Sequence, residues 1–440
     1  MAKGVKGSEK GVKGNGKGVK GSEKGVKGSE RTILHAKTFV PSLPFTPHHS
    51  LSLPKNNLLS LLVLLLLPAF HSHAQEADSS RLRLTVENHH FFRNNEYAGE
   101  RLDGYTLPGF YLRPQLQWQV ESRVRLSAGM HWLHYWGAYR YPSNRSYADR
   151  PLPVHSDTTT AVHLLPWVQA RVDFNPTVSL ILGSLESRDG HGLPQPLFEP
   201  ELRYAADPEA GAQLLVQRPW MDLDLWVNWH EFIFAQSDHQ ERFYIGLSTQ
   251  FRLPLGDWTL RLPLYAIATH YGGESLTVYL RNHHQANYAG GLGVDWTQGD
   301  LGTGLEVIAL GYIQRKGSIH PYDNGWGIYP TLSFRYREAG LRLSYWHGEG
   351  FIPILGSPLF SNASANTEGL TIDRNRLLTL RLDYRWRRFK ACEVTLEGEL
   401  HHCLPWTGDR PGYPKVERDG RTLFGFGIHV KLNPSITLLR

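Results

Sequence analysis

The chain has 440 residues and a formal net charge of +6 at pH 7, from 47 basic and 41 acidic residues. Residues 1–74 hold 11 of the basic and 3 of the acidic residues, which leaves 36 and 38 for residues 75–440. This balance argues against a nucleic-acid-binding protein, and the two cysteines exclude a disulfide-rich scaffold.

The N-terminal part predicts an exported protein. Residues 1–54 form a low-complexity, disordered leader, because their repeated GVKGSEK pattern has too few apolar residues to bury a core. Residues 55–74 hold a lysine, the apolar run Leu58–Leu67 and a small-x-Ala site that ends at Ala74. This layout predicts a signal peptide cleaved after Ala74, and the apolar run is too short for a membrane-spanning helix.

Residues 75–440 are dominated by a two-residue period. In residues 105–120, for example, apolar Leu112, Leu116 and Trp118 alternate with polar side chains such as Gln117. Side chains along a strand point to opposite faces, so such segments are two-faced strands. The period predicts sixteen strands, at residues 81–92, 105–120, 123–137, 161–174, 177–187, 208–218, 222–235, 240–254, 257–272, 286–298, 302–315, 326–337, 340–349, 374–388, 391–403 and 420–432.

The lengths of the strands and of their connections indicate a membrane barrel. Most of the strands have 11–16 residues, whereas strands of soluble proteins have about 5–6. Short turns such as 121–123 and 255–256 alternate with long connections such as 138–160 and 350–373. Short turns on one rim and long loops on the other are typical of outer-membrane barrels. We therefore predict an all-β fold, a transmembrane antiparallel up-and-down barrel of about 16 strands (range 14–18) over residues 75–440.

Aromatic side chains on the apolar face support this fold. They gather near the strand ends, as expected for rings at the level of the lipid headgroups. The predicted girdle residues are Trp118, Trp132, Trp136, Trp229, Trp258, Trp296, Tyr336 and Tyr384.

With this pattern the chain resembles the porin-type outer-membrane β-barrels of Gram-negative bacteria over about residues 80–432. The stretch Gly183–Leu247, which includes GSLESRDGHGLPQPLFEPE and DLWVNWHEF, is similar to uncharacterised barrel proteins of the Bacteroidota. The resemblance implies a location in the bacterial outer membrane and contact with its lipid.

The polar face predicts a water-filled lumen, because sixteen strands enclose more space than their side chains fill. We expect a non-enzymatic channel for passive diffusion of small hydrophilic solutes, without a cofactor and as a monomer or a trimer. Loop 188–207 or loop 350–373, of which the second contains the apolar FIPILGSPLF, would fold inward. The predicted pore-lining residues are Arg113, Arg125, Arg171, Arg252, Arg261, Arg335, Arg342, Arg381, Asp173, Asp224, Asp295, Glu306, Glu397 and Glu399.

Two other functions stay open at this point. The first is a barrel without an open pore that binds surface glycans or assembles the envelope, with sugars stacked on loops such as Tyr135–Tyr141. The second is a barrel lipid hydrolase, for which Asn228, His230 and Ser248 are the candidate residues, although no GxSxG motif supports them. No metal site is expected, because adjacent residues such as His401 and His402 point to opposite faces of a strand.

Overall fold

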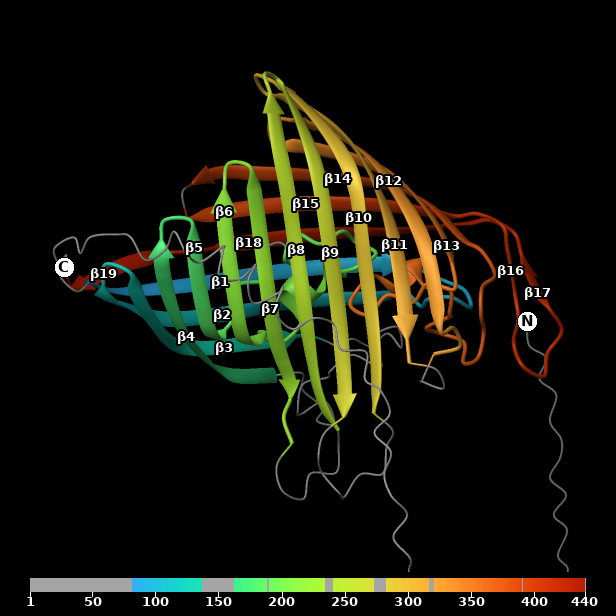
Figure 1. The fold of residues 1–440 in the computed structure, drawn as a ribbon, viewed down its shortest axis with the longest axis horizontal. Helices are drawn as coiled ribbons and strands as arrows, with labels where there is room; N and C mark the ends of the chain where they lie inside the picture. The colour runs from blue at the N-terminus through green and yellow to red at the C-terminus, as the bar shows by residue number, and fades with distance from the viewer. Residues whose placement is uncertain are drawn as a thin grey trace, which may run out of the picture. The chain divides into compact units, whose positions relative to one another are not determined.

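The structure, a computed structural model, describes residues 81–136, 162–187, 190–233, 240–272, 282–315, 320–389 and 391–439 (Figure 1). The predicted leader and signal peptide lie outside these residues and stay predictions. Among the described residues, no helix is long and apolar enough to cross a membrane. Nearly all of the regular structure is one antiparallel sheet of 17 strands.

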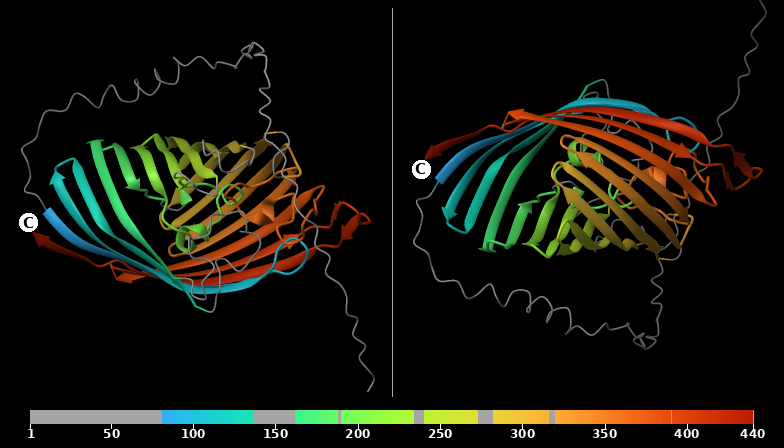
Figure 2. Two further views of the ribbon diagram at one scale, coloured as in Figure 1. Left: turned by 90° about the horizontal axis from the view of Figure 1, so that it is seen from below. Right: turned by 90° about the horizontal axis from the view of Figure 1, so that it is seen from above.

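Sixteen of these strands close into a barrel, as predicted (Figure 2). Each strand pairs with the next along the chain, and the last barrel strand pairs with the first, from Asn88 opposite Leu432 to Glu96 opposite Phe424. The barrel strands are β1 (Arg81–Glu96), β2 (Tyr105–Glu121), β3 (Val124–Tyr135), β4 (Val162–Asn175), β5 (Val178–Ser184), β6 (Ala210–Arg218), β7 (Met221–Glu231), β8 (Glu241–Leu255), β9 (Trp258–Gly272), β10 (His283–Gln298), β11 (Leu301–Gln314), β12 (Asn324–Tyr336), β13 (Ala339–Glu349), β14 (Asn375–Phe389), β15 (Cys392–Cys403) and β18 (Arg421–Leu432).

Five shorter elements were not predicted, and one of them is the 3-10 helix η4 (Pro358–Phe360) in the connection between β13 and β14. Strands β16 (Trp406–Gly408) and β17 (Val416–Arg418) form a small separate hairpin between β15 and β18. Strand β19 (Ser435–Leu439) follows β18 and continues its pairing along β1. Helix α2 (Leu202–Ala205) lies in the connection between β5 and β6. Elements of three to five residues are too short for a periodic sequence pattern.

Strand β9 shows how the sequence period becomes two faces. Leu260, Leu262 and Leu264 are exposed on the outer surface, while Tyr265 and Ile267 of the same strand are buried in the interior. The outer face is therefore apolar and suits lipid, as in barrels of the outer membrane. We call the rim with the tight turns the short-turn rim and the opposite rim the long-loop rim.

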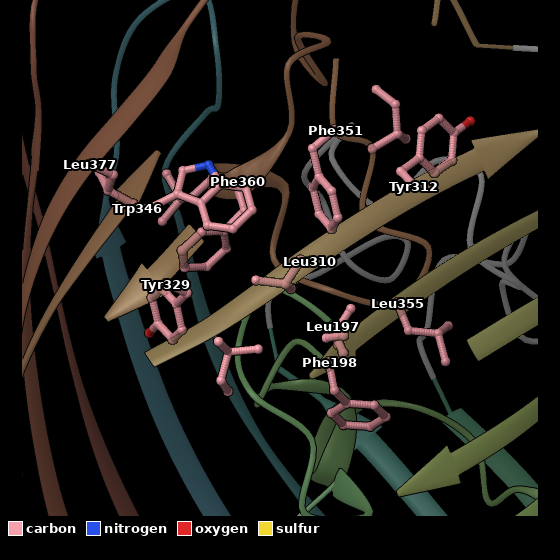
Figure 3. Packing of buried hydrophobic residues seen from close by; sticks show 14 of the residues in the cluster. Leu197, Phe198, Leu310, Tyr312, Tyr329, Trp346, Phe351, Leu355, Phe360 and Leu377 are labelled. Carbon is pink, nitrogen blue, oxygen red and sulfur yellow. The ribbon is translucent and has the colours of Figure 1, made fainter. Parts of the chain in front are cut away.

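Two connections fold into the interior near the long-loop rim. Residues 190–207 and 350–373 pack against each other and against inward side chains of the wall, in one buried apolar cluster (Figure 3). Phe360 is fully buried and meets Tyr329 and Trp346 edge-on, at ring-centroid distances of 5.5 and 5.3 Å. We call these two connections together the plug.

Polar side chains hold the backbone of the plug. The Asn287 amide donates a hydrogen bond to the Ile352 carbonyl (2.9 Å) and accepts one from the Ile354 N–H (2.7 Å). Asn362 and Asn375 likewise donate to plug carbonyls or to the strand beside them. All three asparagines are fully buried. A buried loop needs such partners because each unpaired backbone group would cost stability.

The interior thus differs in part from the expected water-filled lumen. The prediction that loop 350–373 folds inward is confirmed, and residues 190–207 fold inward beside it. Toward the short-turn rim the inner face is polar, as predicted. Toward the long-loop rim the wall itself becomes apolar, with inward Ile267, Ile308 and Leu310. The reason is that these wall positions pack against the plug and are shielded from water.

The plug should contribute strongly to stability. We expect Phe360→Ala to lower the free energy of unfolding by about 3–5 kcal/mol, as for other buried aromatic truncations. The outward Phe424→Ala is the matched control and should cost clearly less, because Phe424 is exposed on the lipid-facing surface. Urea unfolding followed by tryptophan fluorescence would measure both changes. Equal effects of the two substitutions would contradict the packed plug.

Candidate functional site

A cavity lined mostly by polar residues lies inside the barrel and extends to the short-turn rim. Its volume is about 470 Å³. Strands β1, β2, β15 and β18 form much of its wall, and α2 contributes Arg203 and Tyr204. A concave cavity with converging polar groups is the usual place for a binding or active site. We call it the main cavity.

A row of three acid–base groups lies in the wall of the main cavity. His89 Nε2 on β1 and His429 Nδ1 on β18 are joined by a hydrogen bond of 3.1 Å. Glu397 Oε2 on β15 lies 3.8 Å from His429 Nε2. Both histidines are almost completely buried, and all three residues line the cavity. The row therefore places two hydrogen-bonded imidazoles beside a carboxylate, which lies at ion-pair distance from His429 and beyond hydrogen-bond distance.

The closure of the barrel brings this row together. Residue 89 lies opposite Lys431 and residue 429 opposite Phe91, so the two histidines are diagonal neighbours across the seam between β1 and β18. Glu397 lies opposite Gly427 on the other side of β18. All three positions face inward, because side chains on paired strands share a face in register.

The hydrogen bond constrains the protonation of the two rings. Of the two nitrogens that meet, one must donate and the other must accept, so the accepting nitrogen carries no proton. The Glu397 carboxylate favours a proton on His429 Nε2, which leaves His429 Nδ1 as the acceptor. His89 then donates through Nε2, and its Nδ1 is free of a proton. His89 is thus arranged to act as a general base.

Neighbouring groups hold this arrangement in place. Tyr204 of α2 packs edge-on against both imidazoles, with ring centroids 5.5 Å from His89 and 4.9 Å from His429. Burial raises the pKa of the Tyr204 hydroxyl well above its usual value, so it stays neutral. Arg93 lies behind Glu397, at 3.8 Å, and also pairs with Glu399. Tyr204 thus supports the two imidazoles, and Arg93 places a positive charge beside the Glu397 carboxylate.

Cationic groups surround the row. The Arg113 guanidinium pairs with Glu87 at 2.8 Å and lies 3.8 Å from the centre of the Trp167 ring. Further cations of the cavity wall are Arg125, Arg203, Arg385, Arg387 and Lys431. The acidic residues of the wall are Glu87, Glu186, Glu393 and Glu397. A cavity of this kind can bind an anionic group and stabilise negative charge that develops during a reaction.

A second, smaller cavity of about 300 Å³ contains His191, Asp224 and Ser248. His191 Nδ1 lies 2.8 Å from Asp224 Oδ2, and His191 Nε2 lies 2.6 Å from Glu209 Oε2. The ring stacks on Trp226 with centroids 3.7 Å apart. Burial disfavours the charged ring, but Glu209 and Asp224 outweigh it and raise the pKa of His191 to about 9.

His191 is consequently an imidazolium at neutral pH, with both nitrogens donating to carboxylates. Such a ring cannot take a proton from a substrate, so it is a poor general base. Its role is to attach the plug, which carries His191, to the barrel wall, which carries Asp224. The turn Gly190-His191-Gly192 allows this approach because all three residues have positive φ.

The candidate hydrolase trio from the sequence is not assembled. Asp224 lies opposite Ser248, whereas Asn228 and His230 lie four and six positions further along β7. At the usual strand rise these offsets are about 13 and 20 Å. Ser248 shares its cavity with His191 and Asp224, which parity within two strands could not predict.

The predicted pore-lining residues face inward, and most of them form ion pairs with near neighbours. Arg125 lines the main cavity, Arg342 lies opposite Arg381, and Asp224 holds His191. The other pairs are Arg113 with Glu87, Arg171 with Asp173, Arg252 with Asp222, Arg261 with Asp295 and Glu306, Arg335 with Asp383, Arg381 with Glu399, and Glu397 and Glu399 with Arg93.

The predicted girdle residues lie on the outward face. Trp118, Trp258, Trp296, Tyr336 and Tyr384 lie toward the short-turn rim, and Trp132, Trp136 and Trp229 toward the long-loop rim. Of the loop Tyr135–Tyr141, for which the sequence left glycan binding open, only the first two residues are described. Tyr135 is buried and its hydroxyl donates to the Ala205 carbonyl, so it does not offer a face to a sugar.

Comparisons with known proteins give a family. A family model described as lipid A 3'-O-deacylase-type matches residues 74–440. No match was found among the curated proteins. Similar solved structures are OmpT, an outer membrane protein of Vibrio cholerae (10% identity, 81% of this chain and 100% of that one, TM-score 0.45), and Acinetobacter baumannii OccAB1 (9%, 83%, 100%, 0.45). These likenesses carry no conclusion about function, and the resemblance to barrel proteins of the Bacteroidota stays a prediction.

The family match corrects one prediction from the sequence. The expectation of a non-enzymatic protein is wrong, because the matching family is described by a deacylase activity. No local sequence motif marks the acid–base row, because its residues 89, 397 and 429 lie on three strands that are far apart in the chain. The sequence did contain one signal for the row: His89 and His429, on the first and last predicted strands, both occupy inward positions of the two-residue period.

The attachment of the plug by His191 should depend on pH. The pKa of His191 is raised above its value in an unfolded chain, so its stabilising effect is complete below about pH 6.5. The effect declines as pH rises toward 9. We expect wild type to lose more stability than His191→Gln between pH 7 and pH 10. Urea midpoints at both pH values would test this, and an equal loss in the two proteins would contradict it.

Proposed function

Because the chain belongs to the lipid A 3'-O-deacylase-type family, whose model matches residues 74–440, we propose that it hydrolyses an acyl ester of a lipid A-type lipid. The main cavity would be the active site. The observation that carries this proposal is the row Glu397–His429–His89 in the wall of that cavity. A carboxylate that orients an imidazole is the usual arrangement of a general base in ester hydrolysis.

In the proposed reaction His89 Nδ1 accepts a proton from a water molecule, which attacks the ester carbonyl carbon. His429 and Glu397 stabilise the imidazolium that forms, in the same way as a buried aspartate does in a hydrolytic triad. The arginines around the row stabilise the oxyanion of the tetrahedral intermediate. The C–O bond to the sugar then breaks, His89 returns the proton to the departing alkoxide, and the fatty acid is released.

Substitution at the row should abolish most of this activity. We expect His89→Gln and His429→Gln each to lower kcat by about 10²–10⁴, which is the usual contribution of general-base catalysis. The assay is loss of one acyl chain from lipid A in detergent micelles, followed by mass spectrometry. His230→Gln is the matched control, since His230 is another histidine of the barrel and does not line the main cavity. Full activity of both row variants would reject the proposed active site.

A diffusion channel is the second candidate, as predicted from the sequence. The charged walls of the two cavities, of about 470 and 300 Å³, favour it. The apolar plug opposes it, because it packs against the wall near the long-loop rim.

Conductance separates the two candidates. With the plug in place we expect no steady ion current through the purified chain in a planar lipid bilayer. The variant Phe351→Ser/Phe360→Ser, which loosens the plug, should raise the frequency of open events. Large ohmic steps from the wild-type protein would instead favour the channel and would show that the plug leaves a path.

A further inference from the structure

Six histidines lie on the outward, lipid-facing surface of the described strands. Each of them is close to the long-loop rim. Among the described residues, the outward face near the short-turn rim has aromatic residues but no histidine. The six are His90, His134, His270, His284, His347 and His402, on β1, β3, β9, β10, β13 and β15.

The burial of adjacent residues fixes these side chains on the outside. The inward neighbours His89, Leu133, Thr269 and His283 are buried. The outward residues two positions away along the same strands, such as Phe92, Trp132 and Ala268, are exposed. Because side chains alternate along a strand, the histidines share the face of these exposed residues.

Four of the histidines form two rows that run across neighbouring strands. In the first row, Phe110 of β2 lies opposite both His90 and His134. The ring centroids of Phe110 lie 5.6 and 5.8 Å from those of the two histidines. Trp132 and Trp136 pack on the same phenylalanine, at 5.3 and 5.4 Å.

The second row lies on β8, β9 and β10. His270 lies opposite both Phe243 and His284. The two imidazoles share a hydrogen bond of 3.0 Å between their Nδ1 atoms, and the His270 ring lies 4.9 Å from that of Phe243. With Nδ1 engaged in both rings, the Nε2 atoms are the nitrogens available to a further partner.

An imidazole is an unusual group to place against lipid. Aromatic rings without a titratable nitrogen suffice to anchor a barrel at the headgroup level. The described outward face near the short-turn rim has tryptophan, tyrosine and phenylalanine, such as Trp258, Tyr336 and Phe334. A histidine adds a ring N–H that donates to an anion and a ring that can become a cation. Its restriction to one rim therefore indicates an anionic acceptor at that rim.

The charged residues nearby are few. Arg376 lies opposite His347, and the backbone of Arg315 bonds to that of His284. Among the acids on this surface, Glu241 accepts a hydrogen bond from the Trp229 indole, and Glu349 lies near His347 and Arg374. Glu96 accepts a hydrogen bond from Asn94 further up β1. The two rows themselves contain no acid, so they complement a negative group.

We propose that the rows His90–Phe110–His134 and Phe243–His270–His284 bind the phosphate groups of phosphorylated lipids in the leaflet at the long-loop rim. The imidazoles donate to the phosphate oxygens, and the phenylalanines and tryptophans pack on the adjoining apolar part of the lipid. This contact lies outside the barrel and is independent of hydrolysis in the main cavity.

The test uses the full chain, purified in a nonionic detergent. Phosphatidic acid, which carries a phosphate monoester, is added in steps, and native mass spectrometry counts the bound lipid. Phosphatidylcholine is the comparison lipid, because its phosphate is esterified to choline, whose positive charge balances that of the phosphate. We expect phosphatidic acid to bind the wild-type protein at least about ten times more tightly than it binds His90→Gln/His134→Gln/His270→Gln/His284→Gln.

The matched control is Tyr336→Gln/Tyr384→Gln, which replaces two outward rings at the short-turn rim and should bind like wild type. Each row is also changed by itself, so that a comparison remains if the fourfold variant does not fold, as judged by its heat-dependent shift on a gel. Equal binding by wild type and the row variants would overturn the proposal. Equal binding of phosphatidylcholine, or displacement of the lipid by millimolar inorganic phosphate, would overturn it as well.

Discussion

The pairing of β1 with β18 is the constraint on which the rest of the structure depends. A strand at the edge of a sheet exposes unpaired N–H and C=O groups, and these are costly in a lipid environment. The register from Asn88–Leu432 to Glu96–Phe424 removes both edges at once. It also decides which inward side chains meet across the seam, and the pair His89–His429 is one result.

Closure of the barrel creates an interior that the side chains of the wall alone do not fill. The two ends of this interior differ in what fills them. Toward the long-loop rim the plug replaces water, and buried asparagines supply the hydrogen bonds that its backbone would otherwise lose. Toward the short-turn rim the interior stays polar and contains both cavities. Ion pairs such as Arg261 with Glu306 line the wall there. The charged half contains the candidate site, and the apolar half packs against the plug.

Helix α2 and the turn at His191 connect these two halves. Both belong to the connection between β5 and β6, which enters the plug cluster through Leu197 and Phe198. Tyr204 packs on the imidazole pair, and His191 bonds to the wall through Asp224. Movement of the plug would therefore alter the packing of the candidate base, so the position of the plug is linked to the geometry of the site.

The sequence by itself determined the strands. A period of two is a local property of each segment, so the sixteen barrel strands, their outward apolar faces and the alternation of tight turns with long connections could be predicted without any contact information. The inward fold of residues 350–373 was also predictable, because an apolar run such as FIPILGSPLF needs cover.

Only the tertiary structure decided the site. Residues 89 and 429 are 340 positions apart, and their contact depends on the register across the seam, where a slip of one residue would turn one of them outward. The same holds for His191, which meets Glu209 and Asp224 only because its loop folds inward. The two strands β7 and β8 alone suggested His230 as the partner of Ser248, whereas Asp224 lies opposite Ser248 and the histidine that shares its cavity, His191, lies on a loop. The local sequence pattern predicts which face of a strand each side chain occupies. The pairing of β1 with β18 and the inward fold of the plug decide which side chains meet.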